Sequence, residues 1–157
     1  MENNLNCENA SRPVPRPRGD EDHGKRKQLV RIASDWISLW CPPVDWELFH
    51  RLHSGNFQDC SPAERASSKE GFARGLEEFV RAFPDLRTTI DELVVDEAES
   101  KVAILWRAEG TNRTEFMGIG PTGKLTVITG IEIIELFDER IIRRWGEWDI
   151  SDHNVNT

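Results

Sequence analysis

The spacing of apolar residues changes once along this chain, and that change limits the possible folds more than any other feature. Before residue 86 the apolar residues recur at intervals of three or four, as on the buried face of a helix. From Leu86 onward they tend to alternate with polar residues, as in a half-buried strand. Helices that all precede the strands are typical of an α+β fold.

This spacing predicts three helices followed by four strands. Asp45 is the expected N-cap of the second helix, and Ser67 or Ser68 that of the third. A four-stranded antiparallel meander must curl to bury one face, and helices over its concave side leave a pocket at its mouth. The expected helices cover 26–40, 46–52 and 69–83, and the strands 87–95, 101–110, 125–137 and 141–149, with short extended pieces at 57–59 and 114–117.

The two ends of the chain differ from its middle. Prolines 13, 15 and 17 lie in the stretch RPVPRPR and favour an extended conformation over a helix. We therefore expect a disordered arm over residues 1–24, one domain over 25–150 and a flexible tail over 151–157. The alternative for the arm is a docking peptide.

Composition excludes several classes of protein. The net charge is −8, whereas a protein that binds duplex nucleic acid normally carries a basic face. No apolar run approaches the roughly 18 residues that cross a membrane. The three cysteines are an odd number without CxxC spacing, which argues against a disulfide framework or a zinc site. With no apolar signal segment at the start, these features predict a cytoplasmic protein.

An ordered set of short motifs carries a family resemblance. The motifs are FPDL at 83–86, WRAEGT at 106–111, GIGPTGK at 118–124, TGIEI at 129–133 and IIRRWGEWD at 141–149. In this order and spacing they resemble the SnoaL-like polyketide cyclase family, which belongs to the nuclear transport factor 2-like superfamily. The resemblance covers about residues 28–150.

The resemblance implies a cone-shaped α+β barrel. In this fold a curved antiparallel sheet is wrapped by about three N-terminal helices around a deep pocket, and two copies often pair through the outer face of the sheet. It also implies chemistry on a hydrophobic small molecule without cofactor or metal. Relatives close rings by aldol condensation, open epoxides, isomerise ketosteroids or only bind ligands, so the resemblance alone does not fix the reaction.

Two strands supply the candidate catalytic residues. The family places residues that match Ile141 and Trp145 inward, and alternation then points Glu147 and Asp149 inward too. The family often carries Asp or His near the position of Glu132, facing the cavity. On the other face of that strand, Glu135 is expected to point outward and to pair with Arg143 or Arg144.

Two carboxyl groups in a dry pocket do not both ionise cheaply, so one is held neutral and serves as an acid while the other serves as a base. We expect Glu132 and Glu147 to be this pair, with Asp149 as orienter or alternate base. The plainer alternatives are an exposed Glu132, a Glu147 paired with Arg144 or Arg107, and an Asp149 that only ends its strand.

Aromatic residues supply the candidate substrate-binding surface. Trp36, Trp106 and Trp145 could line a cavity for a flat or prenylated hydrophobic substrate, and each also carries an indole N–H. His53 and Met117 complete the predicted set, although a helix-end histidine and a gap-filling methionine are the plainer interpretations. Cys60 stands where relatives often have histidine.

The sequence thus predicts a cofactor-independent cyclase or isomerase of secondary metabolism, acting by carboxylate acid–base catalysis on a polyketide-like or epoxidised substrate. One alternative is an epoxide hydrolase of the limonene-epoxide type, which needs a carboxylate–arginine–carboxylate relay. Glu132, Glu147 and either Arg143 or Arg144 could form one. The other alternative is a binding protein of the same cone shape.

Overall fold

The computed structural model describes residues 22–152, and the predicted order of helices before strands is confirmed. The short extended stretch expected at 57–59 is part of a full strand between the second and third helices, which adds a fifth strand to the expected four. The helices are α1 (Asp22–Ser38), α2 (Trp46–Leu52) and α3 (Lys69–Ala82), and the strands are β1 (His53–Asp59), β2 (Arg87–Asp96), β3 (Lys101–Thr111), β4 (Leu125–Phe137) and β5 (Arg140–Asp152).

The described range also touches the expected ends. Helix α1 begins at Asp22, so residues 22–24 are helical rather than part of an arm. Strand β5 extends to Asp152 and so takes in the first two residues of the expected tail. The rest of the predicted arm and tail lies outside the described residues. No helix within 22–152 is long and apolar enough to cross a membrane.

Both predicted N-caps are confirmed. The Asp45 carboxylate accepts a hydrogen bond from the backbone N–H of Leu48, at 2.9 Å. The Ser68 hydroxyl accepts one from the N–H of Gly71, at 3.2 Å. Each cap satisfies a backbone donor that has no partner inside the helix, and so fixes where α2 and α3 begin.

The sheet has five strands in the order β1-β5-β4-β3-β2. Strands β2 to β5 form the predicted antiparallel meander. The expectation of a wholly antiparallel barrel is corrected in two respects. Strand β1 joins parallel to β5, and the two edge strands β1 and β2 do not pair, so the sheet is mixed and open.

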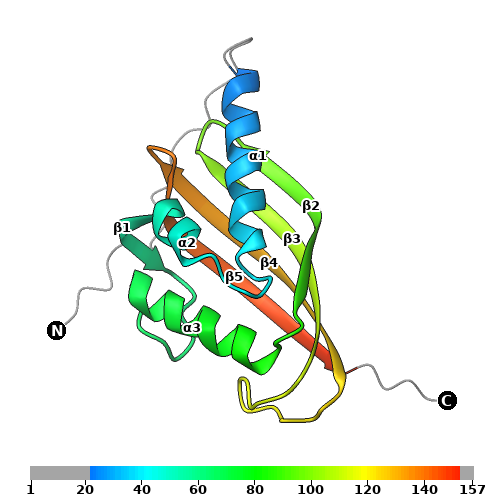
Figure 1. Cartoon of the computed structure of the whole chain (residues 1–157). Coiled ribbons are helices and arrows are strands. Elements are labelled where there is room, and N and C mark those ends of the chain that lie inside the picture. The colour runs from blue at the N-terminus through cyan, green and yellow to red at the C-terminus, as the bar shows by residue number, and fades with distance from the viewer. Residues whose placement is uncertain (1–21, 153–157) are drawn as a thin grey trace.

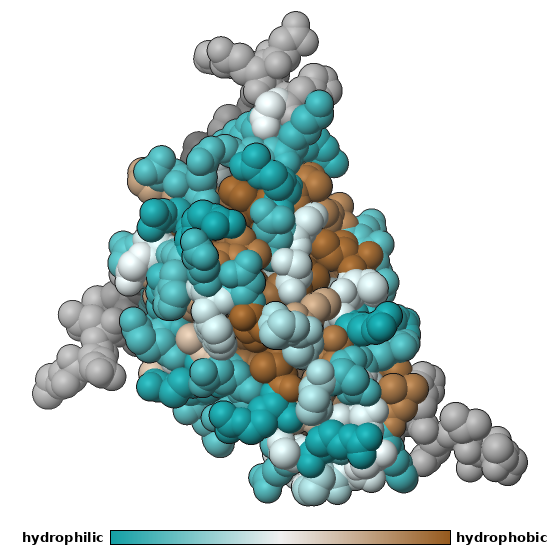
Figure 2. Space-filling view, in the orientation of Figure 1, coloured by the Kyte–Doolittle hydropathy of each residue, from teal (hydrophilic) through white to brown (hydrophobic). Residues whose placement is uncertain are grey.

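The three helices lie on one side of this sheet (Figure 1), as the α+β class requires. On that side, which we call the inner face, β3 and β4 present a buried residue at every second position. Viewed from the helices, the surface shows small apolar groups among hydrophilic residues (Figure 2). The core therefore lies between the helices and the inner face, and the opposite face of the sheet is the outer face.

The short extended piece expected at 114–117 is not a strand. The segment belongs to a loop over residues 112–124, and its only ladder contact is an isolated bridge between Phe116 and Ile119. Positive φ values at Met117 and Gly118, 51° and 76°, turn the chain back on itself there. We call residues 112–124 the β3–β4 loop.

The cysteines also depart from expectation. Cys60, directly after β1, is disulfide-bonded, whereas Cys41 is a free thiol. The cysteines therefore no longer support the argument for a reducing compartment.

Candidate functional site

Glu132 lies on the inner face of β4 and is fully buried, as its predicted orientation requires. Its two carboxylate oxygens meet the guanidinium of Arg144, which lies on the adjacent strand β5. Nε donates to Oε2 at 2.7 Å, and Nη2 donates to Oε1 at 3.0 Å. This two-point contact fixes the plane of the carboxylate as well as its position.

Arg144 also reaches a second buried carboxylate. Its Nη1 donates to Oδ1 of Asp59 at 2.9 Å and to the Ser61 carbonyl at 3.1 Å. Asp59 is 1% exposed, and its other oxygen accepts from Nη2 of Arg65 at 3.0 Å. One guanidinium thus bridges two carboxylates that stand 73 positions apart in the sequence (132 − 59). We call Asp59, Arg144 and Glu132 the buried triad.

Two further residues complete the surroundings of Glu132. The indole Nε1 of Trp148 donates to Oε1 of Glu132. Gly146 stands directly opposite Glu132 in the β4–β5 ladder. A Cβ at this glycine would collide with both Arg144 and Glu132, so only glycine leaves room for the ion pair.

Burial and charge oppose each other in the triad. Burial raises the pKa of Glu132, and Arg144 and the Trp148 N–H act in the opposite direction without cancelling the rise. Burial also disfavours the charge on Arg144, but Glu132 and Asp59 raise the pKa of its guanidinium above the ordinary value. Glu132 is therefore a carboxyl group whose proton affinity is raised, beside a permanent cation.

The expected pairing of Glu132 with Glu147 is wrong. In the β4–β5 ladder Glu147 stands opposite Ile131, on the outer face, and both Glu147 and Asp149 are exposed. The cause is a β-bulge at the start of β5, where Leu136 pairs with Ile141 and Glu135 with Arg143. The extra residue shifts every later side chain to the opposite face.

The same bulge also determines that Arg143 and Trp145 of β5 lie on the outer face. Glu135 points outward and pairs with Arg143 as expected, with Nε to Oε2 at 2.8 Å. Trp145, expected to line a cavity, is instead on the outer face opposite Ile133. Its ring lies beneath the ammonium group of Lys101, at 5.5 Å.

Trp36 and His53, both predicted to contact substrate, are brought together in the core. The Trp36 indole donates to Nε2 of His53 at 3.0 Å, and His53 Nδ1 donates to the Phe49 carbonyl at 2.7 Å. Burial lowers the pKa of His53 to about 4. Both ring nitrogens are engaged and the ring is neutral, so His53 stabilises the core.

Trp106 is buried on the inner face as predicted, beside Trp40 and Trp148. Its ring centroid lies 5.5 Å from that of Trp40 and 5.2 Å from that of Trp148. Its Nε1 is buried and has no hydrogen-bond partner within the described part of the chain. Met117, in contrast, is 62% exposed at the tip of the β3–β4 loop.

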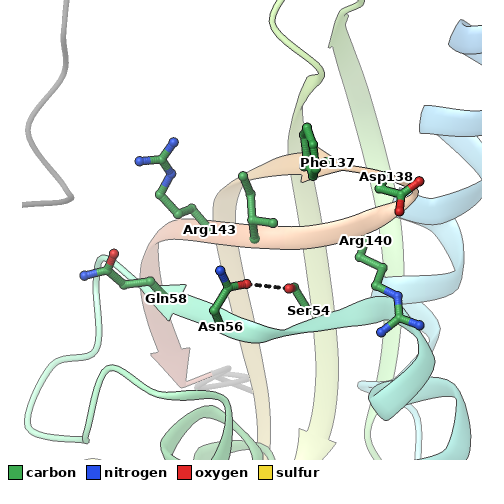
Figure 3. A pocket seen from close by; sticks show the side chains of 8 residues that line it. Ser54, Asn56, Gln58, Phe137, Asp138, Arg140 and Arg143 are labelled. Atoms are coloured by element: carbon green, nitrogen blue, oxygen red, sulfur yellow. Dashed lines mark hydrogen bonds between the residues drawn. The ribbon is translucent and has the colours of Figure 1, made fainter.

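The hollows at β1 and β5, on α1, and between α2 and α3 are all lined by residues other than Glu132. The first of them, about 480 Å³, lies on the outer side of the sheet between β1 and the start of β5. Figure 3 shows Ser54, Asn56 and Gln58 on β1, next to the strand β5 that carries Arg140 and Arg143. On the inner face, aromatic rings fill the space above Glu132, with Phe79 and Trp148 at 5.1 Å. A pocket at Glu132 therefore stays a prediction.

Sequence reasoning missed Asp59, Trp148 and Gly146. It examined the segment that contains Asp59 but concentrated on Cys60. The pairing of Asp59 with Arg144 is a tertiary contact through a parallel strand, for which the local sequence carries no signal. A glycine inside an otherwise β-rich strand is a signal for close approach, and Gly146 could have been recognised in this way.

Within residues 22–152 no group of three or more histidine, cysteine, aspartate or glutamate side chains is arranged to hold a metal ion. The fold and the buried triad together define an α+β protein with one buried cluster of charges on a largely apolar inner face. The model of the SnoaL-like polyketide cyclase family matches residues 31–153, so the chain belongs to that family.

Solved structures agree on the fold. IdmH from Streptomyces antibioticus, a proposed polyketide cyclase, is 23% identical with a TM-score of 0.67, and the match covers 78% of this chain and 92% of IdmH. TsrD from Streptomyces laurentii is 19% identical with a TM-score of 0.70, covering 79% and 90%. AclR from Streptomyces galilaeus, a proposed hydroxylase, is 20% identical with a TM-score of 0.64, covering 82% and 90%. Comparison with curated proteins gives no match.

Proposed function

We propose that this protein is a cyclase or isomerase of secondary metabolism that works without a cofactor, with Glu132 as its acid–base residue. The observation that carries the proposal is the buried triad on the inner face of a SnoaL-like fold. Buried charges are costly and are often retained for function, and titratable groups with perturbed pKa values are typical of catalytic sites. The substrate class is a polyketide-like or epoxidised hydrophobic molecule.

The chemistry follows from the raised proton affinity of Glu132. As a carboxylate it removes a proton from the carbon next to a substrate carbonyl, which gives an enolate. The enolate attacks a second carbonyl of the same chain, a carbon–carbon bond closes the ring, and the new alkoxide takes the proton back from Glu132. No proton or electron is gained or lost overall. Holding both ends of one molecule in an enclosed site supplies much of the rate.

The other members of the triad position Glu132. Arg144 holds the carboxylate plane through two hydrogen bonds, and its charge lowers the cost of returning Glu132 to the ionised form. Asp59 holds the far side of the same guanidinium. Trp148 donates to the oxygen that Arg144 Nη2 also contacts, so withdrawal of its indole would free a lone pair toward substrate.

The test compares Glu132→Gln with Glu135→Gln. Both residues are on β4 and both pair with an arginine of β5, but only Glu132 faces inward. The assay follows ring closure of a poly-β-ketone by liquid chromatography with ultraviolet detection, because the substrate and its aldol product have the same mass. We expect Glu132→Gln to lose at least a hundredfold in kcat, the ordinary contribution of acid–base catalysis, and Glu135→Gln to keep wild-type kcat.

Equal activity of the two variants, with both folded by circular dichroism, would rule out Glu132 as the acid–base residue. If neither the wild type nor the variants turn over but all bind hydrophobic ligands, the protein is a binding member of the family.

A second function, epoxide hydrolysis, is favoured by one particular feature. One guanidinium bridges two carboxylates, as the expected relay requires, with Asp59 in the place assigned to Glu147. One carboxylic acid would protonate the epoxide oxygen while the other carboxylate takes a proton from the attacking water. Turnover in ¹⁸O-water distinguishes the reactions, because the hydrolase product keeps one labelled oxygen and the product of aldol closure gains none from solvent.

We also propose a homodimer formed through the outer face of the sheet. Apolar side chains gather there on adjacent strands, with Leu105 (39% exposed) opposite Ile131 (52%), and Ile133 (39%) opposite Trp145. A second copy of this surface is the proposed occupant, because a two-fold pair matches each apolar row with an identical one.

Light scattering tests the dimer. Ile131→Lys is expected to give a monomer at micromolar concentration. Met117→Lys changes a more exposed residue on the β3–β4 loop, away from this surface, and should stay dimeric. A monomeric wild type, or a dimeric Ile131→Lys, would contradict this assembly.

A further inference from the structure

Between its two ends the β3–β4 loop is fastened to the core by one side chain. The ends are joined by the buried Asn112, whose carbonyl accepts from the N–H of Gly123 at 2.8 Å and whose Oδ1 accepts from that of Thr122 at 3.1 Å. The backbone N–H of Arg113 also donates to the Ala82 carbonyl at 2.7 Å. Of residues 113–125 only Phe116 is buried, and it is 8% exposed. Withdrawal of its ring would therefore release the part of the loop between these anchors, residues 114–121.

The tip of the loop is a self-contained unit. Phe116 and Ile119 exchange both backbone hydrogen bonds, each 2.9 Å long. The two residues between them, Met117 and Gly118, have the positive φ values of a two-residue hairpin turn. The turn is satisfied internally, so the loop can move without breaking its own hydrogen bonds.

Phe116 lies between the loop and the site of Glu132. Its ring stacks on that of Phe79 with centroids 5.1 Å apart, and it lies 6.3 Å from the ring of Trp148. Trp148 in turn donates to Glu132. A molecule that replaced Phe116 would therefore stack on Phe79 beside the residue that contacts the candidate catalytic carboxylate.

The same row of rings contains a hydrogen-bond donor without a partner. Trp106 is fully buried, its ring contacts Trp148, and its Nε1 has no acceptor within the described part of the chain. A buried N–H without an acceptor is costly and rare. An oxygen on a bound molecule would satisfy it.

We propose that Phe116 is a gate residue whose ring occupies the place that the planar ring of a ligand takes when the β3–β4 loop opens. The ligand class is a flat, conjugated molecule with a carbonyl oxygen that accepts from the Trp106 indole. This inference rests on the proposed small-molecule site on the inner face and adds to it the entry route and the shape of the substrate.

The test measures binding rather than turnover. The probes are 2-acetylnaphthalene and 2-ethylnaphthalene, which match in size and differ in the carbonyl oxygen, and stopped-flow tryptophan fluorescence follows their association. In the wild type we expect the observed rate to level off at high probe concentration, because loop opening becomes limiting. A hole merely created by mutation does not give a limiting rate in the wild type.

The gate is tested by Phe116→Ala against Met117→Ala. Burial of a phenylalanine side chain is worth roughly ten- to a hundredfold in an equilibrium. We therefore expect Phe116→Ala to associate at least tenfold faster, without a limiting rate, and Met117→Ala to behave as the wild type. If Phe116→Ala does not fold, Phe116→Leu takes its place with a smaller increase. Equal rates in the two loop variants, or no binding of either probe to the wild type, would overturn the proposal.

The donor is tested by Trp106→Phe. Loss of one hydrogen bond should weaken 2-acetylnaphthalene by about three- to tenfold and leave 2-ethylnaphthalene unchanged. Equal effects on both probes would remove Trp106 from the proposal. Since binding requires no turnover, a negative result here leaves the role of Glu132 open, and retained turnover in Glu132→Gln leaves the loop result standing.

Discussion

Two ion pairs connect β4 to β5 only a few residues apart, and their surroundings differ completely. The inner pair, Glu132–Arg144, and the outer pair, Glu135–Arg143, both have an Nε–O contact below 3 Å, at 2.7 and 2.8 Å. The inner side chains are 0% and 3% exposed, whereas the outer ones are 17% and 33% exposed. The contact distance alone therefore does not distinguish a candidate functional site from an ordinary surface ion pair, whereas burial does.

The comparison also shows what burial requires. Each charge of the inner pair has further polar partners, since Arg144 reaches Asp59 and Glu132 accepts from Trp148. Water can solvate the partly exposed outer pair, so that pair has no such need. Removing one partner should consequently lower the free energy of unfolding strongly for the inner pair and weakly for the outer pair.

The largest expected effect is on stability. Arg144→Leu leaves Glu132 and one oxygen of Asp59 buried without a cation, and should lower the free energy of unfolding by about 3–5 kcal/mol. Arg143→Leu should cost no more than about 1 kcal/mol. Urea unfolding followed by tryptophan fluorescence measures both. Equal losses of stability would mean that water solvates the inner pair in solution.

A double variant sharpens this result. Glu132→Leu together with Arg144→Leu removes both charges, so its loss of stability should be smaller than that of Arg144→Leu alone. An additive loss would show that Glu132 is not the partner left uncompensated.

The second prediction compares a buried and an exposed histidine near the end of α2. His53 is fully buried with a pKa lowered to about 4, whereas His50 is exposed. Below pH 6.5 His53 binds a proton in the unfolded chain but stays neutral in the folded chain. The free energy of unfolding therefore falls as the pH drops from 6.5 to 4. The loss attributable to His53 is about 3 kcal/mol.

Chemical unfolding at pH 7, 5.5 and 4 measures this slope. His53→Gln should flatten it, while His50→Gln should change it only slightly, because the charge of His50 is the smallest of the causes that lower the pKa of His53. An unchanged slope in His53→Gln would assign the acid sensitivity to other groups.

Sequence patterning predicted local structure well, because helix and strand periods reflect which face of each segment is buried. Strand β4 was expected over 125–137 and has these bounds, and α3 was expected to begin at Lys69, where it begins. The outward orientation of Glu135 was also predictable, since β4 contains no irregularity that would reverse its alternation, whereas the choice of Arg143 over Arg144 as its partner depends on the bulge in β5.

The candidate site was harder to predict for a physical reason. Alternation assigns faces correctly only until a bulge inserts a residue, and one extra residue near Ile142 moved Glu147 outward and Arg144 inward. Asp59 reaches the site through the parallel pairing of β1 with β5, which is a tertiary event. Sequence therefore located Glu132 on the inner face and named Arg144 as one of two candidate relay arginines, but it did not find Asp59, Trp148 or Gly146.

The smallest predicted effect concerns the room that the inner pair needs. Gly146→Ala places a methyl group against Arg144 and Glu132, and the pair must shift to accommodate it. We expect a loss of about 1–3 kcal/mol, the usual cost of overpacking. Gly55 of β1 has no atom within 4 Å of an added Cβ, so Gly55→Ala should change stability by less than about 0.5 kcal/mol.

Measurements of activity and stability together show whether displacement of the Glu132–Arg144 pair by Gly146→Ala affects catalysis. If Glu132 acts as the acid–base residue, Gly146→Ala should lower kcat more than its stability loss explains, because the carboxylate plane set by Arg144 would be displaced. If kcat at a temperature where the variant is fully folded equals that of the wild type, the orientation of Glu132 does not limit the reaction. The ion pair would then hold β4 to β5 on the inner face as Glu135–Arg143 does on the outer one.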